Sequence, residues 1–153
     1  MTAFLRTLAA MTLLAGPAAA QTVLTVTGAG EPREYDMEAL RALPSESFET
    51  STIWTDGAST FEGVPLAALM ADLGVEEGTL RATAINDYTV EIPVADALED
   101  GPIVAYARDG APMSVRDKGP LWVVYPYDAD EAFRSETVYG RSIWQLDRIE
   151  VVR

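Results

Sequence analysis

The side chains that perform most enzyme chemistry are missing from this sequence, which has 153 residues but no cysteine and no histidine. Histidine is the usual general base near neutral pH and the commonest metal ligand, and a cysteine thiolate serves as a nucleophile or metal ligand. Catalytic triads that depend on either residue are therefore excluded. What remains is acid chemistry by carboxylates, an all-oxygen metal site, or ligand binding without any reaction.

Carboxylates are the most abundant reactive groups, and four of them lie close together in the C-terminal third, at Asp128, Asp130, Glu131 and Glu136. Oxygen ligands at short spacing are what calcium prefers. This spacing lacks the central glycine and terminal glutamate of an EF-hand loop. We therefore expect surface charges here, and no calcium site.

The charge of the chain is strongly negative, with a formal net charge of −13. This balance argues against binding to nucleic acid or to anionic membrane surfaces. Residues 21–100 hold 16 acidic residues against 3 arginines, whereas residues 101–153 hold 8 acidic against 7 basic residues. A bound anion is thus expected in the C-terminal third, and the acidic N-terminal part is suited to a basic partner surface.

The first twenty residues have the pattern of a cleavable signal peptide. Arg6 is followed by the apolar run Leu8–Ala15, a Gly16-Pro17 break and three alanines that suit signal peptidase. The run is shorter than the roughly 20 residues that cross a bilayer, although a retained anchor is the alternative. We expect cleavage before Gln21, a periplasmic or secreted location without membrane insertion, and a single domain at residues 21–153.

Local patterns predict an α+β domain that is mostly β-sheet with a few short helices. Helices are expected after Asp36 and from Pro65 to Gly74, and one or two helical turns at Val94–Leu98. Asn86-Asp87 and Asp109-Gly110 suit tight hairpin turns. The expected strands, the last with a bulge near Asp147, are Val23–Thr27, Ser47–Trp54, Leu80–Ile85, Tyr88–Ile92, Ile103–Arg108, Leu121–Tyr125 and Trp144–Val152.

Five segments, in the right order between Val23 and Val152, resemble motifs of the oxidoreductase molybdopterin-binding domain family, whose fold is that of sulfite oxidase. In this sequence the segments are Phe61–Met70, Asn86–Pro93, Ile103–Pro112, Gly119–Pro126 and Gly140–Leu146. The last resembles the segment with which the family contacts its pterin cofactor. The resemblance implies the sulfite-oxidase molybdopterin-binding fold, and much less about activity.

The main departure from the family concerns the metal. Catalytic members hold molybdenum through a cysteine that precedes the first of these motifs, whereas Glu49–Gly57 contains none. Ser51 and Asp56 stay open as replacement ligands, but we do not expect molybdenum. The chain is more similar to small exported members without the cysteine, some of which bind a reduced pterin and relay its presence to membrane-bound cyclic-di-GMP enzymes.

The resemblance implies a pterin site built from aromatic platforms and polar edges. The residues expected to form it are Trp54, Asn86, Asp87, Tyr88, Arg116, Lys118, Arg141, Ser142 and Trp144. Each has a simpler interpretation. The tryptophans can equally belong to the core, and Asn86-Asp87 can form a plain turn. Arg116 and Lys118 can be solvated charges of a surface loop, and Arg141 can form an ion pair with Asp128, Asp130 or Glu136.

The sequence leaves two orientations open for Trp122. It begins an apolar run at a position where the family often has arginine, so it faces either the ligand or the core.

Three functions are compatible with these features. The preferred hypothesis is an exported, non-catalytic pterin-binding protein that relays ligand occupancy to the periplasmic domain of a membrane sensor. The second is a molybdenum-cofactor-dependent oxidoreductase, or an electron-transfer partner, without a cysteine ligand. The third is a structural interaction module with no ligand.

Overall fold

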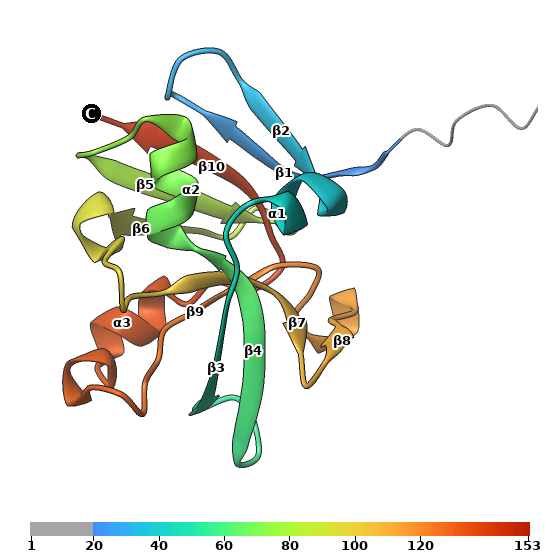
Figure 1. Ribbon diagram of the computed structural model, residues 1–153. Helices are drawn as coiled ribbons and strands as arrows, with labels where there is room; N and C mark the ends of the chain where they lie inside the picture. Colours follow the sequence, from blue (N-terminus) through green and yellow to red (C-terminus); the bar gives the residue numbers. More distant parts are fainter. Residues whose placement is uncertain (1–19) are drawn as a thin grey trace, which may run out of the picture.

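The computed structural model describes residues 20–153, so nearly all of the predicted signal peptide lies outside the described residues. Two five-stranded sheets form the fold, one above the other in Figure 1. The first sheet has the order β2-β1-β10-β5-β6. Its strands are β1 (Thr22–Thr27), β2 (Arg33–Asp36), β5 (Thr79–Ala84), β6 (Thr89–Pro93) and β10 (Leu146–Val152).

The second sheet has the order β3-β4-β7-β8, with β9 also paired to β7. Its strands are β3 (Glu46–Ser51), β4 (Ala58–Pro65), β7 (Ile103–Arg108), β8 (Ala111–Pro112) and β9 (Trp122–Val124). The short helices are α1 (Met37–Ala42), α2 (Leu66–Leu73) and α3 (Glu136–Arg141), with 3-10 turns η1 (Val94–Asp96), η2 (Val115–Asp117) and η3 (Glu131–Phe133). This arrangement confirms the predicted α+β class.

Signals that act within a few residues are confirmed. The Asp36 carboxylate caps α1 by accepting a hydrogen bond from the Ala39 N–H at 2.7 Å. Gly74 ends α2 with φ 67°, in the left-handed region that glycine tolerates. Asp109 and Gly110 join β7 to β8 with φ of 50° and 79°, as a tight hairpin turn requires.

Some predicted boundaries are wrong. The strand predicted at Ser47–Trp54 ends at Ser51, because Trp54 turns into the loop before β4. Pro65 was expected in the first turn of α2, but it is the last residue of β4 and directly precedes that helix. The last strand begins at Leu146, two residues after Trp144, and its predicted bulge is confirmed between Leu146 and Arg148.

Three elements of four or more residues were not predicted, namely β2, β4 and α3. The β2 strand is short and mostly polar, and β4 ends in a Gly-Val-Pro run that suggests a turn. The α3 helix is only six residues long and contains Gly140, so its propensity is weak. Its start is fixed by Ser135, whose side chain accepts a hydrogen bond from the Val138 N–H.

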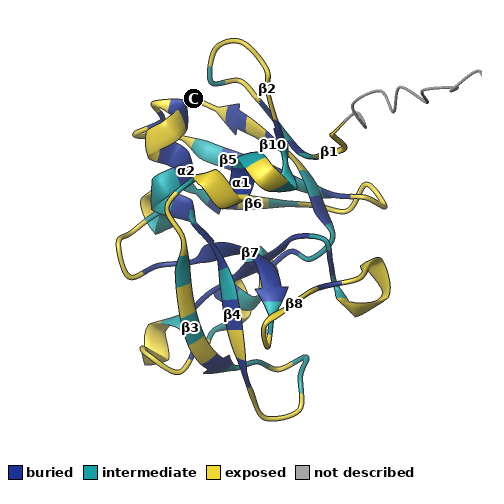
Figure 2. Ribbon diagram, turned by 45° about the vertical axis from the view of Figure 1, so that its right-hand side comes forward, coloured by how far each residue is buried: buried dark blue, intermediate teal, exposed yellow. Residues whose placement is uncertain are grey.

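The core is continuous between the two sheets, and β7 and β9 are its centre. Ile103 to Ala107 of β7 are all buried (Figure 2), and the residues of β9 are buried as well. Strands covered on both faces carry such unbroken apolar runs. Within residues 20–153, no helix has the length and apolar character needed to cross a membrane.

Candidate functional site

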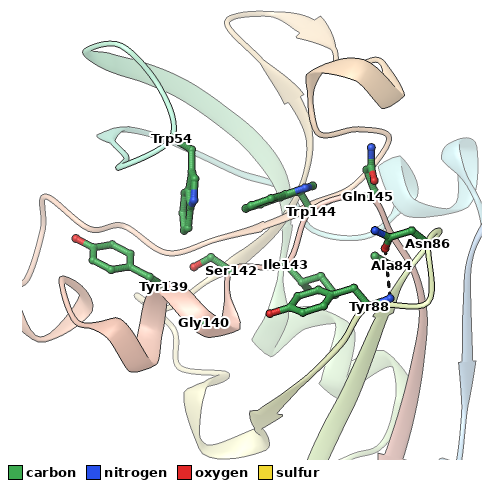
Figure 3. A pocket seen from close by; sticks show the side chains of 10 residues that line it. All are labelled: Trp54, Ala84, Asn86, Tyr88, Tyr139, Gly140, Ser142, Ile143, Trp144 and Gln145. Atoms are coloured by element: carbon green, nitrogen blue, oxygen red, sulfur yellow. Dashed lines mark hydrogen bonds between the residues drawn. The ribbon is translucent and has the colours of Figure 1, made fainter.

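A pocket of about 350 Å³ opens where the two sheets meet, next to α3 (Figure 3). Its volume lies within the range of small-molecule sites in proteins. The loop between β3 and β4, the turn between β5 and β6, helix α3 and the segment before β10 form its walls. The lining residues are Trp54, Ala84, Asn86, Tyr88, Tyr139, Gly140, Ser142, Ile143, Trp144 and Gln145.

Aromatic rings form much of the wall. The ring of Trp54 meets the rings of Trp144 and Tyr139 edge to face, with centroid distances of 5.5 and 5.8 Å. Behind them the fully buried Trp122 contacts Trp54 and Trp144 at 6.0 and 6.4 Å. Trp54 therefore packs against other rings and also lines the pocket, whereas Trp122 belongs to the core.

The loop that carries Trp54 is held at its start by hydrogen bonds to Asp128 and is braced by hydrogen bonds within the loop. Ser51 donates to one Asp128 carboxylate oxygen from both its N–H and its hydroxyl, at 2.7 and 2.5 Å. These hydrogen bonds lower the pKa of Asp128. The Trp54 N–H donates to the Thr52 hydroxyl, which lies 2.8 Å from the Thr55 hydroxyl. The position of Trp54 thus depends on a contact between segments 77 residues apart.

Gln145 lies in the left-handed region with φ 53°, which is unusual for a residue other than glycine. Its N–H donates to the Lys118 carbonyl and its carbonyl accepts from the Ile85 N–H, at 3.0 and 2.9 Å. Its side-chain Nε2 donates to the Val115 carbonyl at 2.7 Å. Within residues 20–153, its Oε1 atom makes no hydrogen bond and stays available as an acceptor.

Asn86 supplies the complementary group on the same side of the pocket (Figure 3). Its Oδ1 accepts a hydrogen bond from the Tyr88 N–H at 3.3 Å, which closes the turn between β5 and β6. Its Nδ2 has no hydrogen-bond partner within the described part of the chain. The pocket thus presents one amide donor and one amide acceptor beside its aromatic rings.

Ser142 is buried, and its hydroxyl is already committed. It donates to the Val138 carbonyl at 2.9 Å and accepts from the Tyr127 hydroxyl at 2.6 Å. Burial raises the pKa of Tyr127 to about 12, so this phenol stays neutral and donates at physiological pH. These bonds anchor the end of α3 to the core and thereby place Tyr139 and Ser142 at the pocket.

None of the four charged residues of the predicted site, Asp87, Arg116, Lys118 and Arg141, lines the pocket. Arg141 pairs with Asp96 at 2.9 Å, and Tyr125 donates to the same Asp96 oxygen at 2.8 Å. The simpler interpretation of Arg141, an ion pair with Asp128, Asp130 or Glu136, is therefore wrong. Asp87, with φ 67°, forms an ion pair with Arg148 and does not line the pocket. Exposed Arg116 forms no ion pair within residues 20–153.

Lys118, the only lysine, lies beside the pocket wall. Its ammonium group is 4.3 Å from the centroid of the Trp144 ring and 5.7 Å from that of Trp122. Cation–π contacts of this kind fix the orientation of the ring. The structure therefore brings Trp54, Asn86, Tyr88, Ser142 and Trp144 together around one cavity, and places Lys118 against the ring of Trp144.

Sequence reasoning missed five lining residues, namely Ala84, Tyr139, Gly140, Ile143 and Gln145. Gly140, Ile143 and Gln145 lie inside the Gly140–Leu146 segment on which the family resemblance rested, so that segment held a signal for them. Tyr139 had no comparable signal, because it lines the pocket only once α3 has formed.

Comparison with known proteins identifies the family. The family described as "Oxidoreductase molybdopterin binding domain" matches residues 14–130. The chain belongs to this family. Its fold is similar to that of the sulfane dehydrogenase SoxCD from Paracoccus pantotrophus, with a TM-score of 0.63 and 18% identity. The similarity covers 84% of this chain but only 37% of the SoxCD chain, so it shows the fold alone. No curated protein sequence matches this chain.

The family implies a molybdopterin cofactor, but the donor atoms of this molybdopterin-domain protein do not fit molybdenum. There is no cysteine in the sequence to supply a thiolate. Of the two replacement candidates, Ser51 uses its hydroxyl on Asp128, and neither it nor Asp56 lines the pocket. The residues that line the pocket are all uncharged. Across residues 20–153, no three acidic side chains gather in a group that could hold a metal ion, and this includes the acids near Asp130.

Proposed function

We propose that this protein binds a pterin-like bicyclic ring in the aromatic pocket and catalyses no reaction on it. The observation that carries the proposal is the combination of aromatic walls with a free amide donor and a free amide acceptor on one side. The proposal also has the protein exported, and reporting ligand occupancy to a membrane-bound signalling enzyme.

A pterin matches the pocket in shape and in polarity. Its flat rings can stack on Trp54 or Trp144, which meet at 70° and so offer two differently oriented faces. Its pyrimidine edge alternates donors and acceptors, which complements Asn86 Nδ2 and Gln145 Oε1. Because no charged side chain lines the pocket, an uncharged ring is favoured there over a charged group.

Export and the relay role are supported by the sequence. Residues 1–20 have the pattern of a signal peptide, and the periplasmic or secreted location follows from it. The partner, a periplasmic sensor domain such as that of a cyclic-di-GMP enzyme, is suggested by the resemblance to small exported family members. The strong net charge of −13 favours a basic surface on that partner.

The second candidate is a molybdenum-cofactor oxidoreductase or electron-transfer partner. Membership of the family favours it, and the fold similarity to a dehydrogenase is compatible with it. The lack of a thiolate and of charged lining residues counts against it. A structural module without a ligand is the third candidate, and the open pocket counts against that one.

One preparation separates these candidates. The mature protein is purified from the periplasm, small molecules are extracted for pterin fluorescence and mass measurement, and molybdenum is assayed in the same sample. We expect a pterin near one per chain and no stoichiometric molybdenum. Stoichiometric molybdenum would refute the proposal in favour of the oxidoreductase. Absence of both, even after incubation with reduced pterins, would refute ligand binding.

A further inference from the structure

A second hollow lies apart from the pocket, along strand β3. It has a volume of about 680 Å³ and is bordered by β3, by the loop after η1 and by the loop between β9 and η3. Phe48, Leu98 and Phe133 give it an apolar floor, and Leu98 is 59% exposed. We call this hollow the β3 groove. An exposed leucine between two half-buried phenylalanines is the kind of surface that a partner covers.

The rim of the β3 groove is acidic. Glu46, Glu99, Asp100 and Asp130 line it, and no basic side chain does. Within residues 20–153, none of these four carboxylates lies within 4.0 Å of a basic group. Desolvation, and then the charges of Asp100 and Glu99, raise the pKa of Glu46.

A neighbouring hollow extends the acidic rim. It shares Glu46, Glu99 and Asp100 with the β3 groove and continues over Pro65 and Ala68 at the start of α2. The two together form one trough. The trough borders the start of β3 at Glu46 and Phe48, and β3 pairs only with β4 among the strands of residues 20–153. Unpaired strand edges are common sites for the binding of an extended segment.

Packed aromatic rings connect the β3 groove to the pocket. Phe133 in the groove lies 5.8 Å from the ring of Tyr125, which lies 6.3 Å from that of Tyr127. Tyr127 in turn lies 5.5 Å from Tyr139, which lines the pocket. The residues between 126 and 141 thus contribute to both sites, so a partner in the groove contacts the same segment that contacts the ligand.

We propose that the β3 groove docks a basic, amphipathic segment of a partner protein. Apolar side chains of that segment cover Phe48, Leu98 and Phe133, while its lysines or arginines pair with Glu46, Glu99 and Asp100. This inference rests on the relay part of the proposed function, for which it names the contact surface, and it does not depend on which ligand occupies the pocket.

The test uses the mature chain and a short labelled peptide in which lysine and leucine alternate, with a glutamate–leucine peptide as the control. Fluorescence anisotropy measures affinity, and amide chemical shifts locate the contact. We expect the basic peptide to bind and to shift the amides of Phe48, Leu98 and Ala129, which line the groove. Shifts spread over the whole acidic surface would overturn the proposal.

Matched variants separate a specific groove from general charge attraction. Glu99→Gln with Asp100→Asn should weaken peptide binding by about fivefold or more, because both charges lie on the rim. Glu31→Gln with Glu34→Gln removes the same charge from exposed positions outside the groove, and should change the affinity by less than about twofold. Equal weakening by both pairs would overturn the proposal.

A second pair of variants tests the apolar floor. Leu98→Ser should weaken binding, whereas Val115→Ser, at a residue that is 54% exposed and lies elsewhere, should not. Sedimentation of the same samples measures self-association. A wild-type dimer that Leu98→Ser dissociates would show that a second copy of this chain occupies the groove, and would also overturn the proposal.

The two proposals fail in different ways. Pterin extraction is repeated on each groove variant, since none of their substituted residues lines the pocket. A bound pterin together with unlocalised peptide binding refutes the groove alone. Localised peptide binding without any pterin refutes the ligand proposal alone.

Discussion

Replacing Trp54 with alanine should weaken pterin binding while the protein stays folded. Trp54 is partly exposed and lines the pocket, and the neighbouring rings lie at steep angles to it, so none of them is stacked parallel on its face. Stacking of a flat heteroaromatic base on an aromatic side chain is worth about 1–3 kcal/mol. The dissociation constant should therefore rise by about 5- to 150-fold.

The same substitution also costs stability, and the structure limits how much. Full truncation of a core aromatic costs about 3–5 kcal/mol, and Trp54 is only partly buried, so we expect about 1–3 kcal/mol. A domain of this size is typically stable by about 5–15 kcal/mol, so the variant should remain folded at 25 °C. Circular dichroism and urea denaturation check this before any affinity is compared.

Isothermal titration calorimetry with a reduced pterin is the assay, and two variants serve as controls. Trp54→Phe keeps an aromatic face and should lose less affinity than the alanine variant. Ile53→Ala changes the adjacent residue in the same loop, which is 62% exposed and does not line the pocket, and should leave the affinity within about twofold. If folded Trp54→Ala binds as tightly as the wild type, the stacking argument is refuted.

Three further outcomes test the framework that holds the pocket. Gly63→Ala should lower the free energy of unfolding, measured by urea denaturation, by more than about 2 kcal/mol, because the added Cβ would overlap the backbone of β7. Gly140→Ala should leave that free energy unchanged or raise it, because no atom lies within 4 Å of the added Cβ. Equal effects of the two substitutions would contradict this reasoning. Asp96→Ala should lower the free energy of unfolding by about 2–3 kcal/mol, because it leaves Arg141 and the Tyr125 hydroxyl without their partner. A loss below about 0.5 kcal/mol would show that these contacts do not stabilise the fold. Burial raises the folded-state pKa of Tyr127 from 10.0 to about 12, so its contribution to the free energy of unfolding is complete below pH 10 and is lost as the pH rises through 12. Between these pH values the free energy of unfolding should fall less steeply with pH for Tyr127→Phe than for the wild type. An unchanged slope would contradict the burial argument.

Residues that act on their near neighbours were predictable, since their effect needs no distant partner. Asp36 capped its helix and Gly74 ended the next one, as expected. The motifs placed the chain in its family, and the family match confirms this placement over residues 14–130, which include four of the five motifs but not Gly140–Leu146. The export, partner and ligand assignments stay predictions, and so do the roles assigned to individual site residues.

Long-range contacts were not predictable. Arg141 pairs with Asp96, 45 residues away, although several acids lie nearer in the sequence. The choice depends on how η1 and α3 meet, which no local pattern encodes. The same holds for Trp54, which left the predicted strand because Ser51 and Asp128 hold the end of β3.

The chemistry available to this protein follows from composition, because a chain without cysteine and histidine lacks their reactions in any fold. The pocket itself does not follow from composition or local pattern. It exists because Trp54, Asn86, Tyr139 and Trp144 come from four separate segments that the two sheets bring together. Side chains far apart in the sequence meet only when burial of the shared core fixes the register and packing of the strands between them.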